Sequence, residues 1–276
     1  MPTKNQMQTV VKALFLTLSF GLFIYGQNNG SKQSINVTYI GNEGILIEAG
    51  NQQVVIDGIH GKYMMYTALE QLQLDDLLNA RKPFERVNLI LASHFHLDHF
   101  NSKMVGAHLQ NNPKAKLICT QQAADDFAKN FAGFEQIKDR VQSPMPNFKE
   151  RTELTFPNGK VSILRLWHSG PLRTTENLGY LLTVNGKKLL HVGDADMSAE
   201  NFEPYKLNNE MIDVAFLPFW YLTDPKGAAF VRQYVPAKQV VAIHIPPADA
   251  EKVLKQVKEN YPEAVCFTTL MEQRIF

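Results

Sequence analysis

The chain has 276 residues, of which 45% are hydrophobic and 20% are charged, and its formal net charge is +1. This composition is typical of a globular protein and offers no basic block for nucleic acid and no long acidic or Gln/Asn-rich run typical of a disordered tail. We therefore expect a folded protein without a nucleic-acid partner, built as one large domain or two small ones.

The N-terminus has the pattern of a secretory signal peptide. Lys4 and Lys12 accompany the apolar stretch ALFLTLSFGLFIYG at residues 13–26, and a polar stretch follows. Because a membrane-crossing helix needs about 20 apolar residues, we predict a signal peptide at 1–26, cleaved after Gly26, and a secreted or periplasmic protein without a stable membrane span. The alternatives are an uncleaved signal anchor, which would tether the protein to a membrane, and a buried N-terminal helix.

The two cysteines are predicted to be buried free thiols. Cys119 and Cys266 both lie in apolar, strand-like runs, KLICT and AVCFTTL. Export would permit a disulfide, but a cysteine in such a run behaves as a small apolar residue. Two cysteines are too few for a Cys-rich structural zinc site.

The first part of the remaining chain predicts strands followed by a helix. Short runs rich in β-branched residues occupy 34–41, 44–50 and 52–58 and are separated by turn residues. They indicate an antiparallel meander. Apolar spacing then predicts a helix around 66–80.

Strands and helices alternate next. Residues 86–93 form a near-continuous apolar run, which is typical of a strand buried on both faces of a sheet. A helix after HFN at 99–101, a strand at 115–120 and a helix at 121–131 complete this part.

The second half repeats the order. Strands are predicted at 151–156, 160–167, 177–184 and 187–194, and then a strand at 211–219, a helix at 226–235, a strand at 238–245, a helix at 247–261 and a closing apolar run at 264–270. Two packed sheets with helices on their outer faces satisfy this order. We predict an α/β fold, a single four-layer αββα domain over residues 27–276.

Three of the eight histidines are concentrated in ASHFHLDHF, at the end of an apolar strand. In an extended backbone, residues i and i+2 point to the same face, so His94 and His96 project together. Asp98 and His99 lie where the chain turns toward the next helix. Two imidazoles from the strand and an Asp–His pair from the loop suit two adjacent metal ions better than one. The alternative is a group of hydrogen-bonded surface histidines.

Three further polar residues interrupt apolar runs at strand ends. His168 stands in WHSG, Asp194 in VGDAD and His244 in AIHIP. Burial of such groups without partners is costly. A shared metal site explains all three interruptions.

The order HFHLDH, WHSG, VGDAD and AIHIP, within about residues 34–276, resembles the metallo-β-lactamase superfamily of binuclear hydrolases. HxHxDH with three downstream ligands is a specific signal, whereas a lone HxH is weak. The resemblance implies the αββα sandwich, with the metals at one edge between the sheets. It implies a first ion held by His94, His96 and His168, a second held by Asp98, His99 and His244, and Asp194 as the bridge. Zinc suits these ligands, and manganese or iron are the alternatives.

Four other residues are candidates for supporting roles. Asp57, in VVIDG, matches an aspartate beneath the metals in this superfamily and would orient His99; the alternative is a turn aspartate. His60 would contact substrate at the pocket rim, or is an ordinary loop histidine. Trp220 and Tyr221 would form an apolar substrate wall, or pack in the core.

Paired divalent ions lower the pKa of a shared water, so that a bridging hydroxide is available near neutral pH. Asp98 would orient it and carry its proton to the leaving group. The reaction class is hydrolysis of an ester, lactone, thioester, amide or phosphodiester. Two divalent ions, two carboxylates and one hydroxide sum to about +1, which favours an anionic or electron-rich small-molecule substrate.

Asp194 occupies the place where one β-lactamase subclass has a cysteine, and another subclass lacks this aspartate. With His99, Asp194 and no cysteine in that place, the chain is closer to the branches that cleave phosphodiesters, lactones and thioesters. Its stretches GILIEAGNQQVVIDG and FLPFWYLTDP, followed by AIHIPP, resemble the subgroup with ascorbate-phosphate lactonase and phospholipase-D-like enzymes. The alternatives are a β-lactam hydrolase, a mononuclear iron enzyme of the persulfide dioxygenase type, and a binding protein without turnover. A flavodiiron reductase would have Glu in place of His96.

Overall fold

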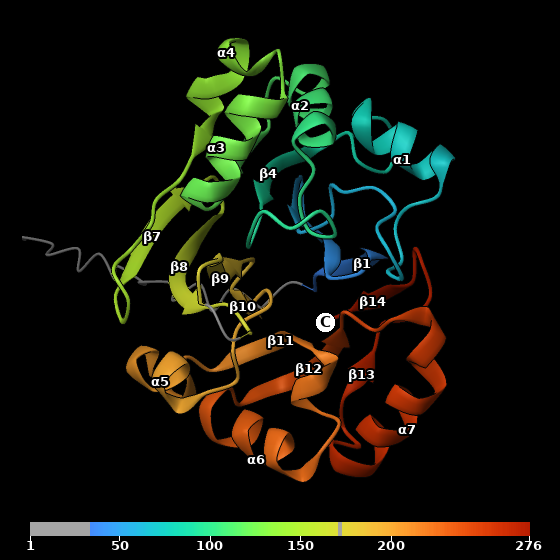
Figure 1. Ribbon diagram of the computed structural model, residues 1–276, viewed down its shortest axis with the longest axis vertical. Helices are drawn as coiled ribbons and strands as arrows, with labels where there is room; N and C mark the ends of the chain where they lie inside the picture. Colours follow the sequence, from blue (N-terminus) through green and yellow to red (C-terminus); the bar gives the residue numbers. More distant parts are fainter. Residues whose placement is uncertain (1–33, 171–172) are drawn as a thin grey trace, which may run out of the picture. The chain divides into compact units, whose positions relative to one another are not determined.

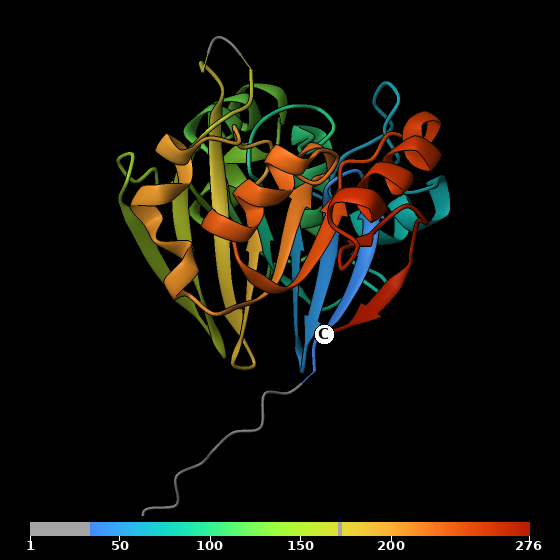
Figure 2. The same cartoon turned by 90° about the horizontal axis from the view of Figure 1, so that it is seen from below.

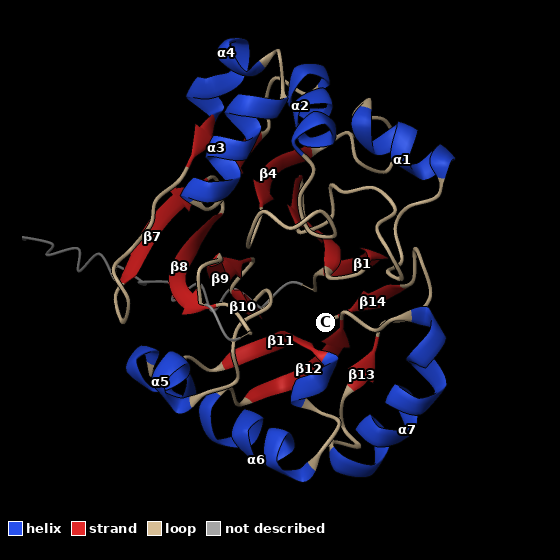
Figure 3. Ribbon diagram, viewed as in Figure 1, coloured by secondary structure: helices blue, strands red, loops and turns tan. Residues whose placement is uncertain are grey.

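Two seven-stranded sheets lie face to face, with helices against both outer faces (Figures 1 and 3). The computed structural model describes residues 34–170 and 173–276, so the predicted signal peptide at 1–26 lies outside the described residues. The layers follow the order helix, sheet, sheet, helix. They confirm the αββα sandwich that the order of strands and helices predicted.

The first sheet contains the predicted meander and extends it on both sides. Its strand order is β14-β1-β2-β3-β4-β5-β6, with the bounds β1 (Asn36–Gly41), β2 (Gly44–Ala49), β3 (Gln52–Ile56), β4 (Val87–Leu91), β5 (Lys116–Ile118), β6 (Val141–Gln142) and β14 (Gln273–Ile275). β1, β2 and β3 pair antiparallel, and β4 and β5 continue the sheet in parallel to β3. β14, which the sequence did not predict, pairs antiparallel with β1 at the sheet edge.

The second sheet is antiparallel in its first part and parallel in its last. Its order is β13-β12-β11-β10-β9-β8-β7, with the bounds β7 (Arg151–Phe156), β8 (Gly159–Trp167), β9 (Glu176–Val184), β10 (Lys187–His191), β11 (Ile212–Pro218), β12 (Ala237–Ile243) and β13 (Val265–Cys266). β7 to β10 pair antiparallel in sequence, and β10 to β13 pair in parallel. The predicted last run, 264–270, is a strand only over β13.

Helices cover the outer face of each sheet. On the first sheet lie α1 (Gln71–Leu78), α2 (Ser102–Asn111), α3 (Gln121–Asn130) and α4 (Phe134–Ile137); on the second lie α5 (Ala199–Phe202), α6 (Pro225–Tyr234) and α7 (Ala250–Asn260), which Figure 2 shows in front of the strands. Short 3-10 turns are η1 (Lys138–Arg140), η2 (Glu203–Tyr205), η3 (Leu207–Asn209), η4 (Phe219–Tyr221) and η5 (Pro247–Asp249). Among the described residues, no helix has both the length and the apolar character to cross a membrane.

Side-chain caps begin α2, α3 and α6. The Asn101 side chain accepts hydrogen bonds from the backbone N–H groups of Lys103 and Met104 at the start of α2. Thr120 caps α3 and Asp224 caps α6 in the same way. Each such cap stabilises a helix by about 1 kcal/mol. The cap at Asn101 therefore fixes the point where the HFHLDHF loop ends and α2 begins.

The helix predicted at 66–80 begins only at Gln71. The preceding segment instead passes against the turn between β1 and β2. Gly41 in this turn has a φ of +111°, and a Cβ there would lie 2.7 Å from the carbonyl oxygen of Thr67. This close approach favours glycine. It also sets the ring of Tyr66 against that of His244, with centroids 4.5 Å apart.

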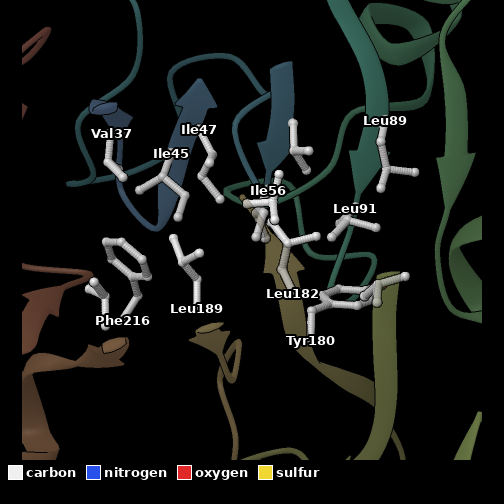
Figure 4. Close-up of a cluster of buried hydrophobic side chains, with 14 of the residues drawn as sticks. Val37, Ile45, Ile47, Ile56, Leu89, Leu91, Tyr180, Leu182, Leu189 and Phe216 are labelled. Atoms are coloured by element: carbon white, nitrogen blue, oxygen red, sulfur yellow. The ribbon is translucent and has the colours of Figure 1, made fainter. Parts of the chain in front are cut away.

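The main core lies between the two sheets. Alternate side chains of the first sheet, including Val37, Ile45, Ile47, Ile56 and Leu91, face Tyr180, Leu182, Leu189 and Phe216 of the second (Figure 4). Burial of each aliphatic or aromatic side chain stabilises the fold by about 1.5–3 kcal/mol. Separate apolar clusters lie between each sheet and its helices.

Both cysteines are free thiols, as predicted. Cys119 is fully buried, but Cys266 is only half-buried, because it lies in the short edge strand β13.

Strand directions bring several chain segments to one edge of the sandwich. Because β1 and β3 both run antiparallel to β2, the β1–β2 turn lies at the edge where β3 and β4 end. In the second sheet, β8, β10 and β12 share one direction. Two backbone hydrogen bonds join the sheets, from His244 N to Asn42 O at 3.0 Å and from Leu178 N to Ser93 O at 2.9 Å.

Candidate metal centre

The seven side chains predicted as metal ligands lie together at this edge. His94, His96, Asp98 and His99 follow β4, His168 follows β8, Asp194 follows β10 and His244 follows β12. Five of them are buried, whereas His96 and His168 are half-buried. His244 has a φ of +63°, an unusual conformation for a residue with a side chain. Such strain is found most often at functional sites.

Asp194 directs one carboxylate oxygen toward each of two groups of histidines. Its Oδ2 lies 3.7 Å from His168 Nε2 and 4.0 Å from His94 Nε2. Its Oδ1 lies 3.4 Å from His244 Nε2 and 3.6 Å from His99 Nε2. Two ligands of a tetrahedral ion with bonds of about 2.1 Å are about 3.4 Å apart. The observed separations are therefore those of side chains that could share an ion.

The first group consists of three imidazoles. The ring centroid of His94 lies 4.6 Å from that of His96 and 4.8 Å from that of His168, and each pair of rings meets edge to face. One nitrogen from each ring lies within 4.8 Å of the other two. This spacing leaves room for one cation among the nitrogens.

The second group combines imidazoles with a carboxylate. Asp98 Oδ2 lies 3.7 Å from both His99 Nε2 and His244 Nε2. The Asn42 amide holds Asp98 in place, because its Nδ2 donates to the Asp98 carbonyl at 3.1 Å and to Oδ2 at 3.2 Å.

Asp57 fixes the tautomers of one histidine in each group. Its Oδ2 accepts from His99 Nδ1 at 3.1 Å and from Ser93 Oγ at 2.5 Å, while its Oδ1 accepts from Ser93 N at 2.6 Å. Since the Ser93 hydroxyl donates to Asp57, it accepts from His94 Nδ1 at 2.9 Å. His94 therefore carries its proton on Nδ1, His99 donates to Asp57 from its Nδ1, and both rings direct Nε2 into the site. His168 has the same tautomer, with Nδ1 donating to Ser169 O at 2.5 Å.

The electrostatics favour neutral imidazoles in the first group. Burial lowers the pKa of His94 well below its usual range, and the charge of His99 adds to this effect. Burial also lowers the pKa of His96, as does His168. Neutral imidazole is the form that binds metals.

In the second group, nearby carboxylates and imidazoles determine the pKa values. Burial acts to lower the pKa of His99, but the charge of Asp194 and the hydrogen bond to Asp57 outweigh it and raise that pKa to about 10. Burial acts to raise the pKa of Asp194, yet His244 and His99 hold it well below its usual range. Before an ion binds, His99 is thus a cation facing an ionised Asp194.

Several atoms at the centre are buried without partners in the part of the chain that the structure describes. They are His94 Nε2, His168 Nε2, Asp194 Oδ1 and both ring nitrogens of His244. A buried polar atom without a hydrogen bond costs about 1–3 kcal/mol. These atoms are imidazole nitrogens and a carboxylate oxygen, the donors that zinc and similar ions use. The residues therefore fit a metal site.

The other predicted site residues divide between the centre and the core. His60 is 2% exposed and its Nδ1 contacts the Gly61 carbonyl at 3.0 Å, so it lies inside the protein and not at an open rim. Trp220 is half-buried with its ring centroid 5.2 Å from that of His244. Tyr221, by contrast, is fully buried and its hydroxyl donates to Ala195 O at 2.7 Å. The predicted role of Tyr221 as a substrate wall is therefore wrong, because core packing holds its ring.

Four residues at the centre were not recognised in the sequence: Asn42, Glu43, Ser93 and Tyr66. Ser93 stands directly before His94 at the end of β4, and its role depends on the tautomer network. Asn42 and Glu43 form the β1–β2 turn, where polar residues are expected in any hairpin. The predicted topology could have identified Asn42 and Glu43, since an antiparallel meander places the β1–β2 turn beside Asp57.

A cavity of about 210 Å³ opens beside the first group. It is lined by His96, His168, Ser169, Gly170, Arg173, Thr174 and Thr175. The Arg173 guanidinium is held by Glu200 at 3.1 Å and Asp196 at 3.7 Å. The walls are therefore polar and carry a cation that is largely balanced by local carboxylates.

Comparison with known proteins agrees with this geometry. A family model described as the beta-lactamase superfamily domain matches residues 45–268. A UPF0173 metal-dependent hydrolase of Bacillus velezensis is 26% identical over 223 residues, which cover 76% of this chain and 85% of the relative. A UPF0173 metal-dependent hydrolase of Pyrococcus furiosus is 25% identical over 242 residues, covering 82% and 93%.

Solved structures show the same fold. Igni18, a metallo hydrolase from the archaeon Ignicoccus hospitalis, has a TM-score of 0.60 at 20% identity, covering 88% of this chain and 99% of its own. The family model spans most of the chain, and its match includes all seven residues of the candidate centre. The chain therefore belongs to the metallo-β-lactamase superfamily.

Proposed function

We propose that this metal-dependent hydrolase holds two divalent ions and uses them to cleave an ester, lactone, thioester or phosphodiester. The observation that carries the proposal is that the two carboxylate oxygens of Asp194 face different groups of histidines. Its Oδ2 faces His94 and His168, and its Oδ1 faces His99 and His244. A carboxylate that serves two groups of ligands in this way is suited to bridge two ions.

The ligand sets follow from this division. His94, His96 and His168 would hold the first ion, Asp98, His99 and His244 would hold the second, and Asp194 would contact both. Imidazole nitrogens and carboxylate oxygens favour zinc, and manganese and iron are the next candidates. A mononuclear iron site of the dioxygenase type would need only one group and would leave the other three side chains without a role.

When bound, the paired ions lower the pKa of a shared water and polarise the bond under attack. Asp98 is the residue placed to handle protons. Its side chain is 9% exposed, borders the second group and is held by the Asn42 amide at 3.2 Å. It would accept a hydrogen bond from the attacking water and carry the proton to the leaving group.

The surroundings suggest a small molecule with a polar and an apolar part. Hydroxyl groups and Arg173 line the cavity beside His96 and His168. On the side of His244, the Trp220 ring is half-buried and its centroid lies 5.2 Å from that of the imidazole. The reacting group would lie between these two regions. The positive charge of two ions favours an anionic substrate.

The N-terminal pattern supports export of the protein, as a secreted or periplasmic enzyme. The polar flank, apolar stretch and small residue at Gly26 form the pattern of a cleavable signal peptide. Mass spectrometry of the exported protein would test this, with a new N-terminus at residue 27 as the expected result and retention of residues 1–26 as the contrary one.

Metal analysis combined with two single-site variants tests the two-ion proposal. Wild-type protein should bind two ions and hydrolyse at least one member of a panel of phosphodiesters, lactones, thioesters and β-lactams. His168→Ala should lose the first ion and His244→Ala the second, each with at least a 100-fold fall in kcat/KM. The proposal fails if His94→Ala and Asp194→Ala leave metal content and turnover unchanged.

A further inference from the structure

Glu43 is a fully buried carboxylate beside the candidate metal centre, and neither group of predicted ligands includes it. It lies in the turn between β1 and β2 and is 0% exposed. The strand directions bring this turn to the edge where β3 and β4 end, next to Asp57 and His99. A glutamate in a hairpin turn ordinarily faces solvent, so this burial requires an explanation.

Neither carboxylate oxygen of Glu43 has a hydrogen-bond partner among residues 34–170 and 173–276. The approaching nitrogens, His191 Nε2 at 3.8 Å and His99 Nδ1 at 3.9 Å, lie beyond hydrogen-bond distance. A buried carboxylate without a partner is strongly unfavourable unless a cation or a donor compensates it.

The groups on one side of Glu43 are already engaged with others. His191 Nδ1 accepts from Gly193 N at 3.2 Å, so its Nε2 carries the proton and donates to the Glu43 main-chain carbonyl at 3.1 Å. Both oxygens of Asp57 are occupied by Ser93 and His99. This side therefore supplies no compensation for the Glu43 carboxylate.

The other side of Glu43 faces atoms that also lack partners. One oxygen of Glu43, one of Asp194 and one nitrogen of His244 lie within 4.8 Å of one another. Asp194 Oδ1 and both nitrogens of His244 have no hydrogen-bond partner in the described ranges. Three metal-binding atoms, two carboxylate oxygens and one imidazole nitrogen, thus come together at the second group.

We propose that Glu43 is an additional carboxylate ligand of the ion held by Asp98, His99 and His244. This inference rests on the two-ion function proposed above. With Glu43, the second ion has three carboxylates and two imidazoles around it, whereas the first has three imidazoles and the shared Asp194. An ionised Glu43 would also offset the net positive charge of about +1 counted for the centre without it, so the preference for an anionic substrate would then depend on the ions themselves and not on the net charge of the centre. Carboxylate oxygens suit manganese, and imidazole suits zinc. The two positions should therefore differ in metal preference, with the second more tolerant of Mn²⁺.

The test compares Glu43→Gln and Glu43→Ala with wild-type protein and with Glu48→Gln. Glu48 is a matched control, because it is a partly buried glutamate on β2 whose oxygens bind Asn36, Gln53 and Arg86 away from the centre. Metal-free proteins are titrated with Mn²⁺ and with Zn²⁺ by calorimetry, and their thermal unfolding is recorded without metal. Mn²⁺ electron paramagnetic resonance reports the environment of the second ion.

Both Glu43 variants should weaken the second binding step at least 10-fold, with a larger loss for Mn²⁺ than for Zn²⁺, and leave the first step within 2-fold. Metal-free Glu43→Gln should unfold at the same or a higher temperature than wild type, because a neutral amide replaces a buried acid whose ionised form has no compensating partner among the described residues. Glu48→Gln should bind both ions as wild type does.

A second binding step within 2-fold of wild type in Glu43→Gln, the variant of closest shape, would overturn the inference. So would a lower unfolding temperature of the metal-free variant with unchanged metal affinity, which indicates a purely structural role. If wild-type protein itself binds only one ion, the two-ion function fails and the assignment of Glu43 fails with it. If wild type binds two ions and the variants match it, only the assignment of Glu43 fails.

Discussion

Asp57 and His99 are joined by a hydrogen bond of 3.1 Å from His99 Nδ1 to Asp57 Oδ2. The same oxygen accepts from Ser93 Oγ, which in turn accepts from His94 Nδ1. One buried carboxylate therefore orients a ligand of each predicted ion. The two groups of the centre are therefore linked twice, through Asp194 and through the hydrogen bonds of Asp57 and Ser93 to the Nδ1 atoms of His99 and His94.

Asp57→Asn should weaken the binding of both proposed ions. The neutral amide accepts a hydrogen bond less strongly and no longer favours the Nδ1 proton on His99 and, through Ser93, on His94. Loss of such outer contacts typically costs 10- to 100-fold in metal affinity. Competition with a chelator measures this loss. Asp213→Asn is the matched control, since Asp213 is a buried carboxylate at the start of β11 that binds Lys188 N and Lys238 Nζ; equal losses in both variants would contradict the assignment.

Ser93→Ala should weaken mainly the binding of the first proposed ion. The substitution removes the link from Asp57 to His94 but keeps the direct hydrogen bond from His99 to Asp57. The first binding step should therefore weaken about 10-fold while the second changes little. Calorimetric titration separates the two steps. An equal effect on both would show that His94 does not depend on Ser93 for its tautomer.

Metal binding should release protons at pH 8. The pKa of His99 is raised to about 10, so this residue is protonated before an ion binds, and the ion requires the neutral ring. Affinity for the second ion should accordingly increase with pH between 7 and 9. Titrations in buffers of different ionisation enthalpy give the number of protons released. A heat of binding that is the same in every buffer would contradict a protonated His99.

Gly193→Ala should destabilise the protein by about 1–3 kcal/mol and disturb Ser93. Gly193 has a φ of +57°, and a Cβ there would lie 2.5 Å from Ser93 Cβ and from Asn177 Oδ1. Denaturant unfolding measures the stability, and metal titration measures the effect on the first ion. Wild-type stability together with wild-type metal affinity would show that the backbone can relax at this position.

Trp220→Ala and Tyr221→Phe should have different effects although the residues are adjacent. Tyr221→Phe removes the donor to the buried Ala195 carbonyl and should cost about 1–3 kcal/mol of stability with little change in KM. Trp220→Ala exposes His244 and should raise KM with a smaller loss of stability. Steady-state kinetics beside thermal unfolding distinguish these outcomes. An unchanged KM in Trp220→Ala would exclude this ring from the substrate site.

The fold and the predicted ligands could be found in the sequence because each predicted ligand lies at the end of an apolar strand or in the loop that follows it. A histidine or aspartate after such a run, as at His168 and Asp194, must lie at a strand end, and parallel strands bring their ends together. The prediction that Tyr221 lines the substrate site was wrong for a related reason. It also follows a strand, but the side of the η4 turn that it occupies faces the core, and sequence spacing does not determine that side.

Glu43 and Ser93 show what the sequence pattern left out. Neither interrupts a strand in an unusual way: Glu43 stands in a turn, and Ser93 is a small polar residue at a strand end. Their importance depends on which neighbours occupy the hydrogen-bonding atoms of Asp57 and His191. Those contacts join residues far apart in the chain, so only the packed sandwich defines them.

The backbone hydrogen bond from His244 N to Asn42 O joins the two sheets beside the centre. Neither sheet alone carries a complete set of the predicted ligands, so an ion held by them would bind with full affinity only after the two halves have closed. By thermodynamic linkage, the free energy of ion binding is then added to the free energy that keeps the sheets together. Loss of ions would thus open the sandwich more readily, and metal supply would set the lifetime of the folded enzyme as well as its rate.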